Sequence, residues 1–319
     1  MNLLHPMNRD SEPPVSEPLV SVIIPVYNDA ERLQTCLDRL SKQTYSAFEV
    51  IVIDNGSSDW LAVEAVVDSY LMNHYLSVSL ISEATPSSYA ARNAGIAHAK
   101  GEILAFTDAD CLPARDWLAQ GVSQMQAHPG CGLIAGAIHI VTQNNRHPVE
   151  LYESVMALSQ QRFVTQDHFG ATANIFTRPE VFESVGLFNT LLKSSGDVDW
   201  GQRVFAAGYE QIYAEAVQVE HPARQTFAQL AKQASRHAGG FYQVRCEQNK
   251  SAVERNVAFL KLLGFHIMPP VLFALEMARH PRLQTPIKVA KVVMTLAFVR
   301  AVIVKSLISL RFGGAAERR

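Results

Sequence analysis

The chain has 319 residues, 48% of them hydrophobic and 18% charged, which excludes a wholly disordered protein. Its four cysteines are scattered and form no C-x-x-C pair, which argues against a zinc site or a disulfide framework and fits a reducing cytoplasm. Residues 222–319 hold 16 Lys/Arg and four acids, a net charge of +12, which leaves 12 basic and 26 acidic residues, or -14, in residues 1–221. This division predicts an acidic body followed by a basic, surface-seeking tail.

Buried-strand and helical patterns alternate through the first third of the chain. Strand-like apolar runs occupy 20–28, 48–54, 76–82 and 102–110, and helical spacing occupies 29–43, 60–70 and 89–101. Leu33, Leu37 and Leu40 fall on one face of the first helix. Asp29 is placed to cap its start, and Gly101 is placed to end the third helix. The alternation predicts βαβ units and a mostly parallel sheet flanked by helices.

Polar residues follow three of these strands. They are Tyr27 and Asn28, Asp54 and Asn55, and Asp108 and Asp110. In an open parallel sheet, ligands bind beyond the carboxyl ends of the strands, where these residues would meet. The chain has neither G-x-G-x-x-G after the first strand nor a P-loop, so a dinucleotide dehydrogenase or a P-loop enzyme is not expected. A diphosphate bound here would need cations, and strand-end carboxylates suit Mg²⁺ or Mn²⁺.

Five segments in order carry a family resemblance over residues 20–221. They are VSVIIPVYND, FEVIVIDNGSSD, YAARNAGIAHAKGEILAFTDADCLP, ATANIFTRPEVFESVGLFN and SSGDVDWGQRVFAAGY. Together they resemble the glycosyltransferase family 2 enzymes, which have the GT-A fold, a Rossmann-like, mostly parallel sheet flanked by helices. The resemblance implies transfer of a sugar from a nucleotide diphosphate sugar with inversion at the anomeric carbon.

The resemblance assigns nucleotide-binding roles to residues at the strand ends. Pro25 and Tyr27 stand where the first loop meets the base, although Tyr27 could equally pack as a strand-end aromatic. Asp54 takes the first acidic place after the second strand, and Asn55 replaces a second Asp common in the family. Arg92 matches the A-R-N arginine near the nucleotide, with pairing to an acid at the sheet rim as its alternative.

The same resemblance implies a metal site and a catalytic base. Asp108 would meet the ribose and the metal shell, Asp110 would ligate the metal between the phosphates, and His221 would complete the shell unless it is simply exposed before Pro222. The motif usually written G-E-D-x-D-L appears here as SGDVDW, so the usual Glu is replaced by a glycine. Asp197 is then the candidate base, with a helix N-cap as its alternative role, and Asp199 is a support or an acceptor contact.

The basic tail carries the expectation of membrane contact. The segment 222–245 reads as a helix broken at Gly239–Gly240, and the apolar segment 262–275 is interrupted by Pro269–Pro270. Residues 287–311 read as one long, imperfectly amphipathic helix with cationic residues only, as expected for a helix lying in an anionic lipid surface. Its polar side is formed by Lys288, Lys291, Thr295, Ser306 and Ser309. Packing on the body as a soluble cap and a true membrane span are the alternatives.

These patterns predict three regions. Residues 1–18 lack an apolar core and a cleavage pattern and are expected to be a disordered leader; residues 19–221 form the catalytic domain, and residues 222–319 a membrane-associating helical extension. The predicted protein is a metal-dependent glycosyltransferase peripherally attached at the cytoplasmic membrane face. It would use a UDP-sugar, with dTDP- or GDP-sugars as alternatives, and a polysaccharide or lipid-linked acceptor, and it would bind no nucleic acid. A sugar-phosphate nucleotidyltransferase, or a catalytically silent scaffold with this fold, is the rival hypothesis.

Overall fold

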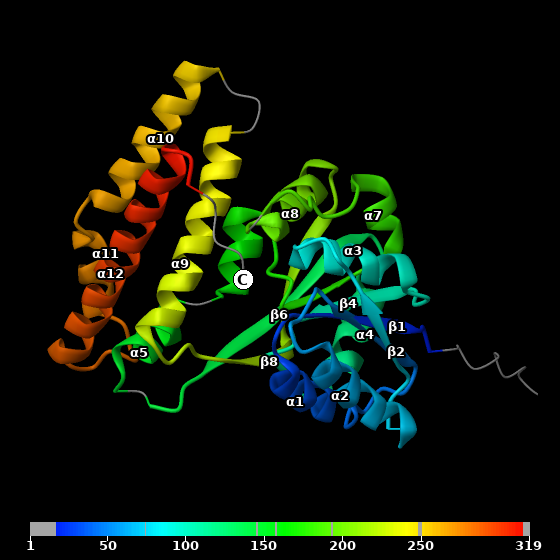
Figure 1. The fold of residues 1–319 in the computed structure, drawn as a ribbon. Coiled ribbons are helices and arrows are strands. Elements are labelled where there is room, and N and C mark those ends of the chain that lie inside the picture. Colours follow the sequence, from blue (N-terminus) through cyan, green and yellow to red (C-terminus); the bar gives the residue numbers. More distant parts are fainter. Residues whose placement is uncertain are drawn as a thin grey trace, which may run out of the picture.

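The computed structural model describes residues 17–73, 75–144, 146–156, 158–192, 194–247 and 251–314. An eight-stranded mixed sheet is flanked by helices, and further helices from the end of the chain pack beside it (Figure 1). In chain order the strands are β1 (Val20–Val26), β2 (Phe48–Asp54), β3 (Val78–Ser82), β4 (Ile103–Thr107), β5 (Leu112–Pro113), β6 (Cys131–Val141), β7 (Asn174–Thr177) and β8 (Glu210–Pro222). The predicted leader lies almost entirely outside the described residues.

Helices connect the strands and form the end of the chain. They are α1 (Ala30–Leu40), α2 (Trp60–Met72), α3 (Ser88–His98), α4 (Trp117–Ala127), α5 (Pro148–Met156), α6 (Gln160–Arg162), α7 (Pro179–Val185), α8 (Gly196–Ala206), α9 (Phe227–Tyr242), α10 (Ala252–Ile267), α11 (Val271–Ala278) and α12 (Pro286–Arg311). Two short π-helical segments, η1 (Phe163–Asp167) and η2 (Gln243–Glu247), follow α6 and α9.

The sheet has a parallel half and a mixed half. Its strand order is β3-β2-β1-β4-β7-β6-β8-β5, and β3, β2, β1 and β4 are mutually parallel, which confirms the alternating pattern of the first third of the chain. Beyond them, β7 runs antiparallel to β4 and β6, β8 runs parallel to β6, and β5 runs antiparallel to β8. The parallel half therefore turns the ends of β1, β2 and β4 toward one edge.

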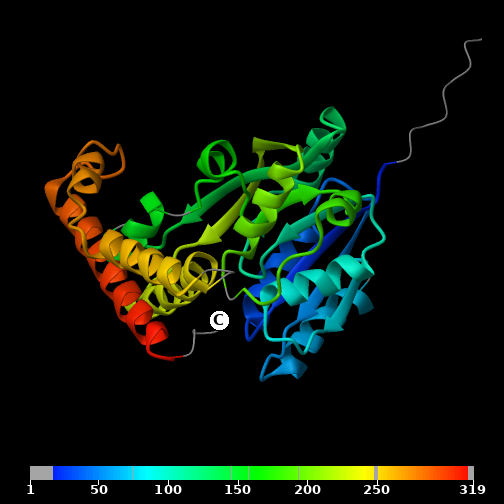
Figure 2. The ribbon, with the colours of Figure 1, turned by 90° about the horizontal axis from the view of Figure 1, so that it is seen from above.

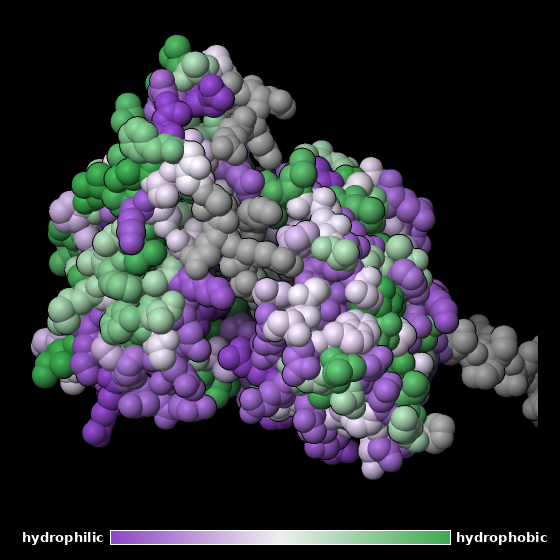
Figure 3. All heavy atoms as spheres, viewed as in Figure 1, coloured by the Kyte–Doolittle hydropathy of each residue, from purple (hydrophilic) through white to green (hydrophobic). Residues whose placement is uncertain are grey.

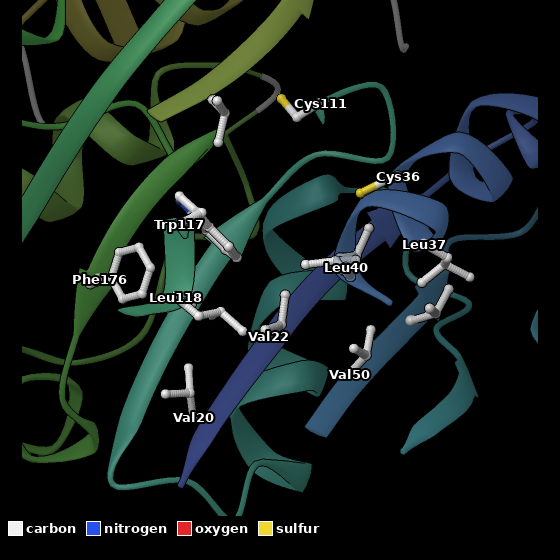
Figure 4. Packing of buried hydrophobic residues seen from close by; sticks show 14 of the residues in the cluster. Val20, Val22, Cys36, Leu37, Leu40, Val50, Cys111, Trp117, Leu118 and Phe176 are labelled. Atoms are coloured by element: carbon white, nitrogen blue, oxygen red, sulfur yellow. The ribbon is translucent and has the colours of Figure 1, made fainter. Parts of the chain in front are cut away.

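Both faces of the sheet are buried, which explains why the first strands are continuous apolar runs. Val22 and Ile24 of β1 pack with the α1 side chains Leu33, Leu37 and Leu40, as the helical spacing predicted. Figure 4 shows this core, in which the Trp117 and Phe176 rings also meet at 4.9 Å between centroids. Ile23, the intervening residue of β1, points to the opposite face and packs with α3.

Three local expectations need correction. Asp29 occupies the N-cap position of α1, but its side chain makes no capping hydrogen bond and pairs with Arg32 instead. Helix α3 ends at His98, and Gly101 lies beyond it against β1, where a Cβ would stand 2.5 Å from the Ser21 backbone nitrogen. Gly239–Gly240 does not break α9, which runs on to Tyr242 before the π-helical segment begins.

The C-terminal helices pack against one another and against α5. Helix α12 is a single long helix, as predicted, and lies along α9 and α5. Helices α10 and α11 meet at a 43° bend, where Pro269 and Pro270 interrupt the ladder of backbone hydrogen bonds. Figure 2 shows these helices gathered at one end of the sheet.

Candidate active site

A cavity of about 480 Å³ lies at the carboxyl ends of β1, β2 and β4 and extends to α9 and α12. Eight of the predicted site residues line it: Pro25, Tyr27, Asn55, Arg92, Asp108, Asp110, Asp197 and His221. Asp54 and Asp199 are not among the lining residues. The fold therefore brings together side chains separated by almost 200 positions.

The loops after β1 and β2 are tied together by polar side chains. Asn28 has a left-handed backbone (φ 51), and its side-chain oxygen accepts a hydrogen bond of 2.7 Å from the Ser58 N–H. Asp54 is buried, and its Oδ2 accepts the N–H groups of Gly56 and Ser57, each at 3.0 Å. Asp54 thus shapes the turn beneath the cavity, and its predicted contact with a nucleotide stays a prediction.

Asn55 is held at the cavity wall by backbone carbonyls beyond β3. Its side-chain amide donates to the Glu83 oxygen at 2.9 Å and to the Thr85 oxygen at 2.7 Å. An aspartate, the commoner residue of the resemblance, has no hydrogens for these two acceptors. The Asn is therefore matched to its surroundings in this chain.

Arg92 and Asp108 form a close ion pair at the centre of the same edge. The Arg92 side chain, on α3, is 4% exposed and donates to Asp108 Oδ1 at 2.5 Å. Of the two roles considered from the sequence, the pair with an acid is the one seen here, and it also places the guanidinium on the cavity wall.

Strand pairing assembles a candidate metal-binding group at Asp110 and His221. In the antiparallel β5–β8 ladder Leu112 lies opposite Glu220. Cys111, which precedes Leu112, therefore lies next to His221, which follows Glu220. One ligand atom each of Asp110, Cys111 and His221 lies within 4.8 Å of the others, and His221 Nε2 is 3.6 Å from Asp110 Oδ2. His221 Nδ1 lies 2.9 Å from the Pro222 carbonyl, which suits a tautomer with the proton on Nδ1 and leaves Nε2 as the ligand atom.

The composition of this group favours an oxygen-preferring ion bound through Asp110 and His221. Burial, together with the charges of Asp110 and Asp108, raises the pKa of the Cys111 thiol well above its ordinary value. A protonated thiol is a poor ligand, and Mg²⁺ or Mn²⁺ prefers carboxylate oxygens. Asp108 pairs with Arg92 through Oδ1, and its predicted share in the metal site stays a prediction.

Asp197 stands at the start of α8 and faces the cavity. The protein atoms around its carboxyl group raise its pKa by desolvation, while Arg92 and the Val198 N–H act in the opposite direction. A carboxylate with a raised pKa accepts a proton more readily, which suits a general base. The cap role weighed from the sequence is not seen, since Ser195 occupies the N-cap position.

Asp199 lies on a different face of α8 from Asp197 and does not line the cavity. Its carboxylate pairs with Arg203 at 3.2 Å, and Arg203 donates to the Leu187 backbone oxygen at 2.8 Å. Asp199 thereby braces α8 against the segment that follows α7.

The far wall of the cavity comes from residues that the sequence interpretation did not select. Arg224, which follows β8, pairs with the buried Glu153 of α5 at 2.7 Å. Helix α9 contributes Arg236 and His237, and α12 contributes apolar side chains. Burial, together with Arg236 and Arg224, lowers the pKa of His237 to about 3, so this histidine is neutral. Arg224 lies three residues after a candidate metal ligand, a signal that could have marked it.

Comparison with known proteins identifies the family. The family model described as "Glycosyl transferase family 2" matches residues 21–186. The chain belongs to this family. Glycosyltransferase AglE of Haloferax volcanii is 37% identical over 266 residues, covering 82% of this chain and 86% of that protein. Pre-mycofactocin glycosyltransferase of Mycobacterium tuberculosis is 29% identical over 212 residues, covering 64% of this chain and 43% of that protein.

Solved structures share the fold. A mannosyltransferase of Pyrobaculum calidifontis, PcManGT, determined with GDP-Man and Mn²⁺, superposes with a TM-score of 0.61 at 22% identity, covering 94% of this chain and 89% of that one. Residues 1–349 of S. aureus TarS, determined with UDP-GlcNAc, superpose with a TM-score of 0.55 at 17% identity, covering 92% of each chain. The fold is therefore that of the GT-A glycosyltransferases, as the resemblance implied.

Proposed function

We propose that this family 2 member is an inverting, metal-dependent glycosyltransferase that moves a sugar from a nucleotide diphosphate sugar to a hydroxyl acceptor. The observation that carries the proposal is the placement of Asp197, with its raised pKa, in the same cavity as the Asp110–His221 group and the Arg92–Asp108 pair. One cavity thus offers a base, a cation site and a guanidinium.

In the proposed reaction each of these groups has a role. The donor's base would rest near Pro25, Tyr27 and Asn55, with its diphosphate toward Asp110. Asp197 would take the proton of the acceptor hydroxyl as the acceptor oxygen forms a bond to the anomeric carbon. The bond from that carbon to the diphosphate breaks on the opposite side, so the configuration inverts, and Asp197 leaves the step protonated.

Asp110 and His221 would hold the Mg²⁺ or Mn²⁺ ion. Bound there, the ion would supply positive charge against the leaving diphosphate. The Mn²⁺ bound in the PcManGT complex supports this assignment. The GDP-Man and UDP-GlcNAc complexes of the related structures support a nucleotide sugar, and a UDP-sugar remains our first choice, with GDP- and dTDP-sugars next.

A donor panel tests this function. Turnover of UDP-, GDP- and dTDP-sugars with Mn²⁺ would be measured for the wild type and for Asp197→Asn, which we expect to lower kcat roughly 100- to 10,000-fold. Asp199→Asn is the matched control, since that carboxylate lies outside the cavity lining. Inert donors together with no stabilisation by any nucleotide would contradict the proposal. Pyrophosphate release from a nucleoside triphosphate and a sugar phosphate would favour the nucleotidyltransferase.

We also propose that the C-terminal region attaches the protein peripherally to the cytoplasmic membrane face, where the acceptor would be a lipid-linked or polysaccharide glycan. Helix α12 has the length and composition to cross a membrane, and α10 with α11 passes the same test as a bent pair. Such helices also occur in soluble proteins, so attachment to a membrane depends on which of their apolar side chains are exposed.

The polar side predicted for α12 largely faces the protein. Lys291 donates to the Arg146 backbone oxygen at 2.8 Å, Thr295 is buried, and Ser306 lies 2.6 Å from Ser235 on α9. Most of the polar side of α12 is therefore not free to contact lipid headgroups, which differs from the expectation based on the sequence. Contact with lipid would therefore have to be made largely by α10 and α11.

Helices α10 and α11 expose the larger apolar surface, visible as green spheres over these helices in Figure 3. On α10, Val253, Val257, Leu260 and Ile267 lie within about 80° of arc, and on α11 Leu272 is 82% exposed. Lys261 and Arg279 are also exposed there, and the region is net positive. Apolar side chains with flanking cations match an anionic lipid surface.

Flotation with vesicles containing anionic phospholipid tests this attachment. The double variant Leu260→Gln/Leu272→Gln should leave the vesicle fraction, because the apolar area that enters the interface is lost. The control Leu61→Gln changes a leucine of α2 that is 70% exposed, and it should bind as the wild type does. Equal vesicle binding by the double variant and the wild type would refute the assignment. Deleting residues 285–319 is a poorer test, because it also removes Val299 and Ile303 from the cavity wall.

A further inference from the structure

Tyr89, the second residue of α3, reaches across the cavity wall to the start of α8. Its hydroxyl lies 3.5 Å from Asp197 Oδ1. Its ring packs on Phe188 at 5.9 Å between centroids, so the side chain is buried and held from the side. Burial and the charge of Asp197 raise the pKa of Tyr89, which keeps its hydroxyl protonated and able to donate.

Gly196 makes this approach possible. A Cβ at position 196 would stand 2.7 Å from both Cε2 and Cζ of the Tyr89 ring, a distance that real side chains do not show. Its backbone dihedral needs no glycine, since α8 begins there with ordinary helical geometry. The glycine is therefore explained by the ring that occupies the space of its missing side chain.

We propose that Tyr89 is a positioning residue that orients the Asp197 carboxylate toward the acceptor hydroxyl, and that Gly196 is required for this contact. The inference rests on the proposed role of Asp197 as the base. A hydroxyl donating to one carboxylate oxygen leaves the other turned toward the cavity, so the base has one preferred orientation.

The surroundings of Asp197 make an orienting contact useful. Arg92 lies on the same helix as Tyr89, with its guanidinium carbon 5.8 Å from the Tyr89 ring centre, and it is already paired with Asp108. The positive charge of Arg236 on α9 lowers the pKa of Tyr89. The charges of Arg92 and Asp108 act on the Asp197 pKa in opposite directions. Helix α3 thus carries two residues of the proposed site. Arg92 pairs with Asp108 near the proposed donor position, and Tyr89 lies beside Asp197, the proposed base for the acceptor.

Tyr89→Phe tests the hydroxyl without removing the ring. We expect kcat to fall about three- to tenfold while the KM for the donor stays unchanged, because a weak hydrogen bond to the base is lost and no donor contact is. The acid limb of the pH profile should move to higher pH, since the donated hydrogen bond stabilises the charged carboxylate and its loss raises the pKa of Asp197. The control Tyr70→Phe removes a buried tyrosine's hydrogen bond to Asp38 on the outer helices, and both kinetic parameters should stay at wild-type values.

Gly196→Ala probes the same contact from the other side. The added methyl group must displace the Tyr89 ring, so we expect kcat to fall at least as far as in Tyr89→Phe. In the double variant the two losses should not multiply, because both act through one contact. Wild-type kcat and pH profile in Tyr89→Phe, or a change confined to KM, would overturn the inference provided that Asp197→Asn is inactive. Activity retained in Asp197→Asn would instead overturn the proposed function itself.

Discussion

The two ends of the cavity are built by different means. At the sheet end, Tyr27, Asn55 and Asp108 directly follow β1, β2 and β4, and their places are set by the parallel pairing of these strands. At the helical end, Arg224, Arg236 and His237 are placed by the packing of α5, α9 and α12 and by the ion pair with Glu153. Backbone pairing fixes the first set independently of side-chain identity, whereas the second set depends on individual contacts. Substitutions at the two ends should therefore fail differently.

Between the two ends of the cavity, the larger effect is expected at the sheet end, from Asp110→Ala. Loss of the carboxylate should lower kcat/KM on the order of 100-fold and abolish stabilisation by Mn²⁺ in a thermal melt. Stability without metal should change little, because β5 and β8 remain paired. Cys111→Ser is the control, with less than a tenfold change expected if the thiol is no ligand. An equal loss in both variants would make Cys111 part of the cation site.

An intermediate effect is expected at the helical end, from Gly240→Ala. Its Cβ would meet the Ser194 Cβ at 2.8 Å and the Ser194 oxygen at 2.9 Å, so α9 must move away from the loop that precedes Asp197. We expect roughly a tenfold loss of kcat and a destabilisation of about 1–3 kcal/mol, as for other overpacked sites.

Gly264→Ala on α10 is the matched control for that variant. The structure has nothing within 4 Å of its added Cβ, so it should stabilise the protein by up to about 1 kcal/mol through helix propensity. Steady-state kinetics and urea unfolding would measure both variants. Full activity in Gly240→Ala would show that the helical end can move independently of the base.

The stability of the helical region is also expected to depend on pH. The pKa values of His237 and His266 are lowered to about 3 and about 4 in the folded protein, mainly by burial, from an ordinary value of 6.5. Between those values the unfolded chain binds protons that the folded chain does not, so the free energy of unfolding should decrease as the pH falls below about 6.5. Urea unfolding of His237→Gln should show a shallower decrease than the wild type. An unchanged slope would mean that His237 is accessible to protons.

The sequence predicted the sheet end well because its signals are local. The run before Asp54 and the run before Asp108 each form a buried strand. The pairing of such a strand within the sheet determines the position of the residue that follows it. The β7-β6-β8-β5 half was not predicted, because its antiparallel and crossed pairings join segments up to about 100 residues apart. No periodicity encodes such a pairing.

Side-chain partners were the hardest feature to predict. Arg92 was expected near the nucleotide, which stays a prediction, whereas its pair with Asp108 depends on the separation of α3 and β4 in space. The Gly239–Gly240 pair was interpreted as a break because glycine weakens helices, yet both residues are buried in α9 and one closely approaches Ser194. Tertiary packing decided the helix there, and a single sequence carries no record of it.

Strand β8 limits how far the chain can be truncated from its C-terminal end. The segment matched by the family model ends at residue 186, before β8 begins at Glu210. A protein truncated there would keep β6 but lose its parallel neighbour, so a long row of backbone N–H and C=O groups would open to solvent. Such an edge invites pairing between chains. The minimal soluble unit should therefore extend at least through Pro222, and shorter versions should aggregate even though they contain every residue that the family model matches.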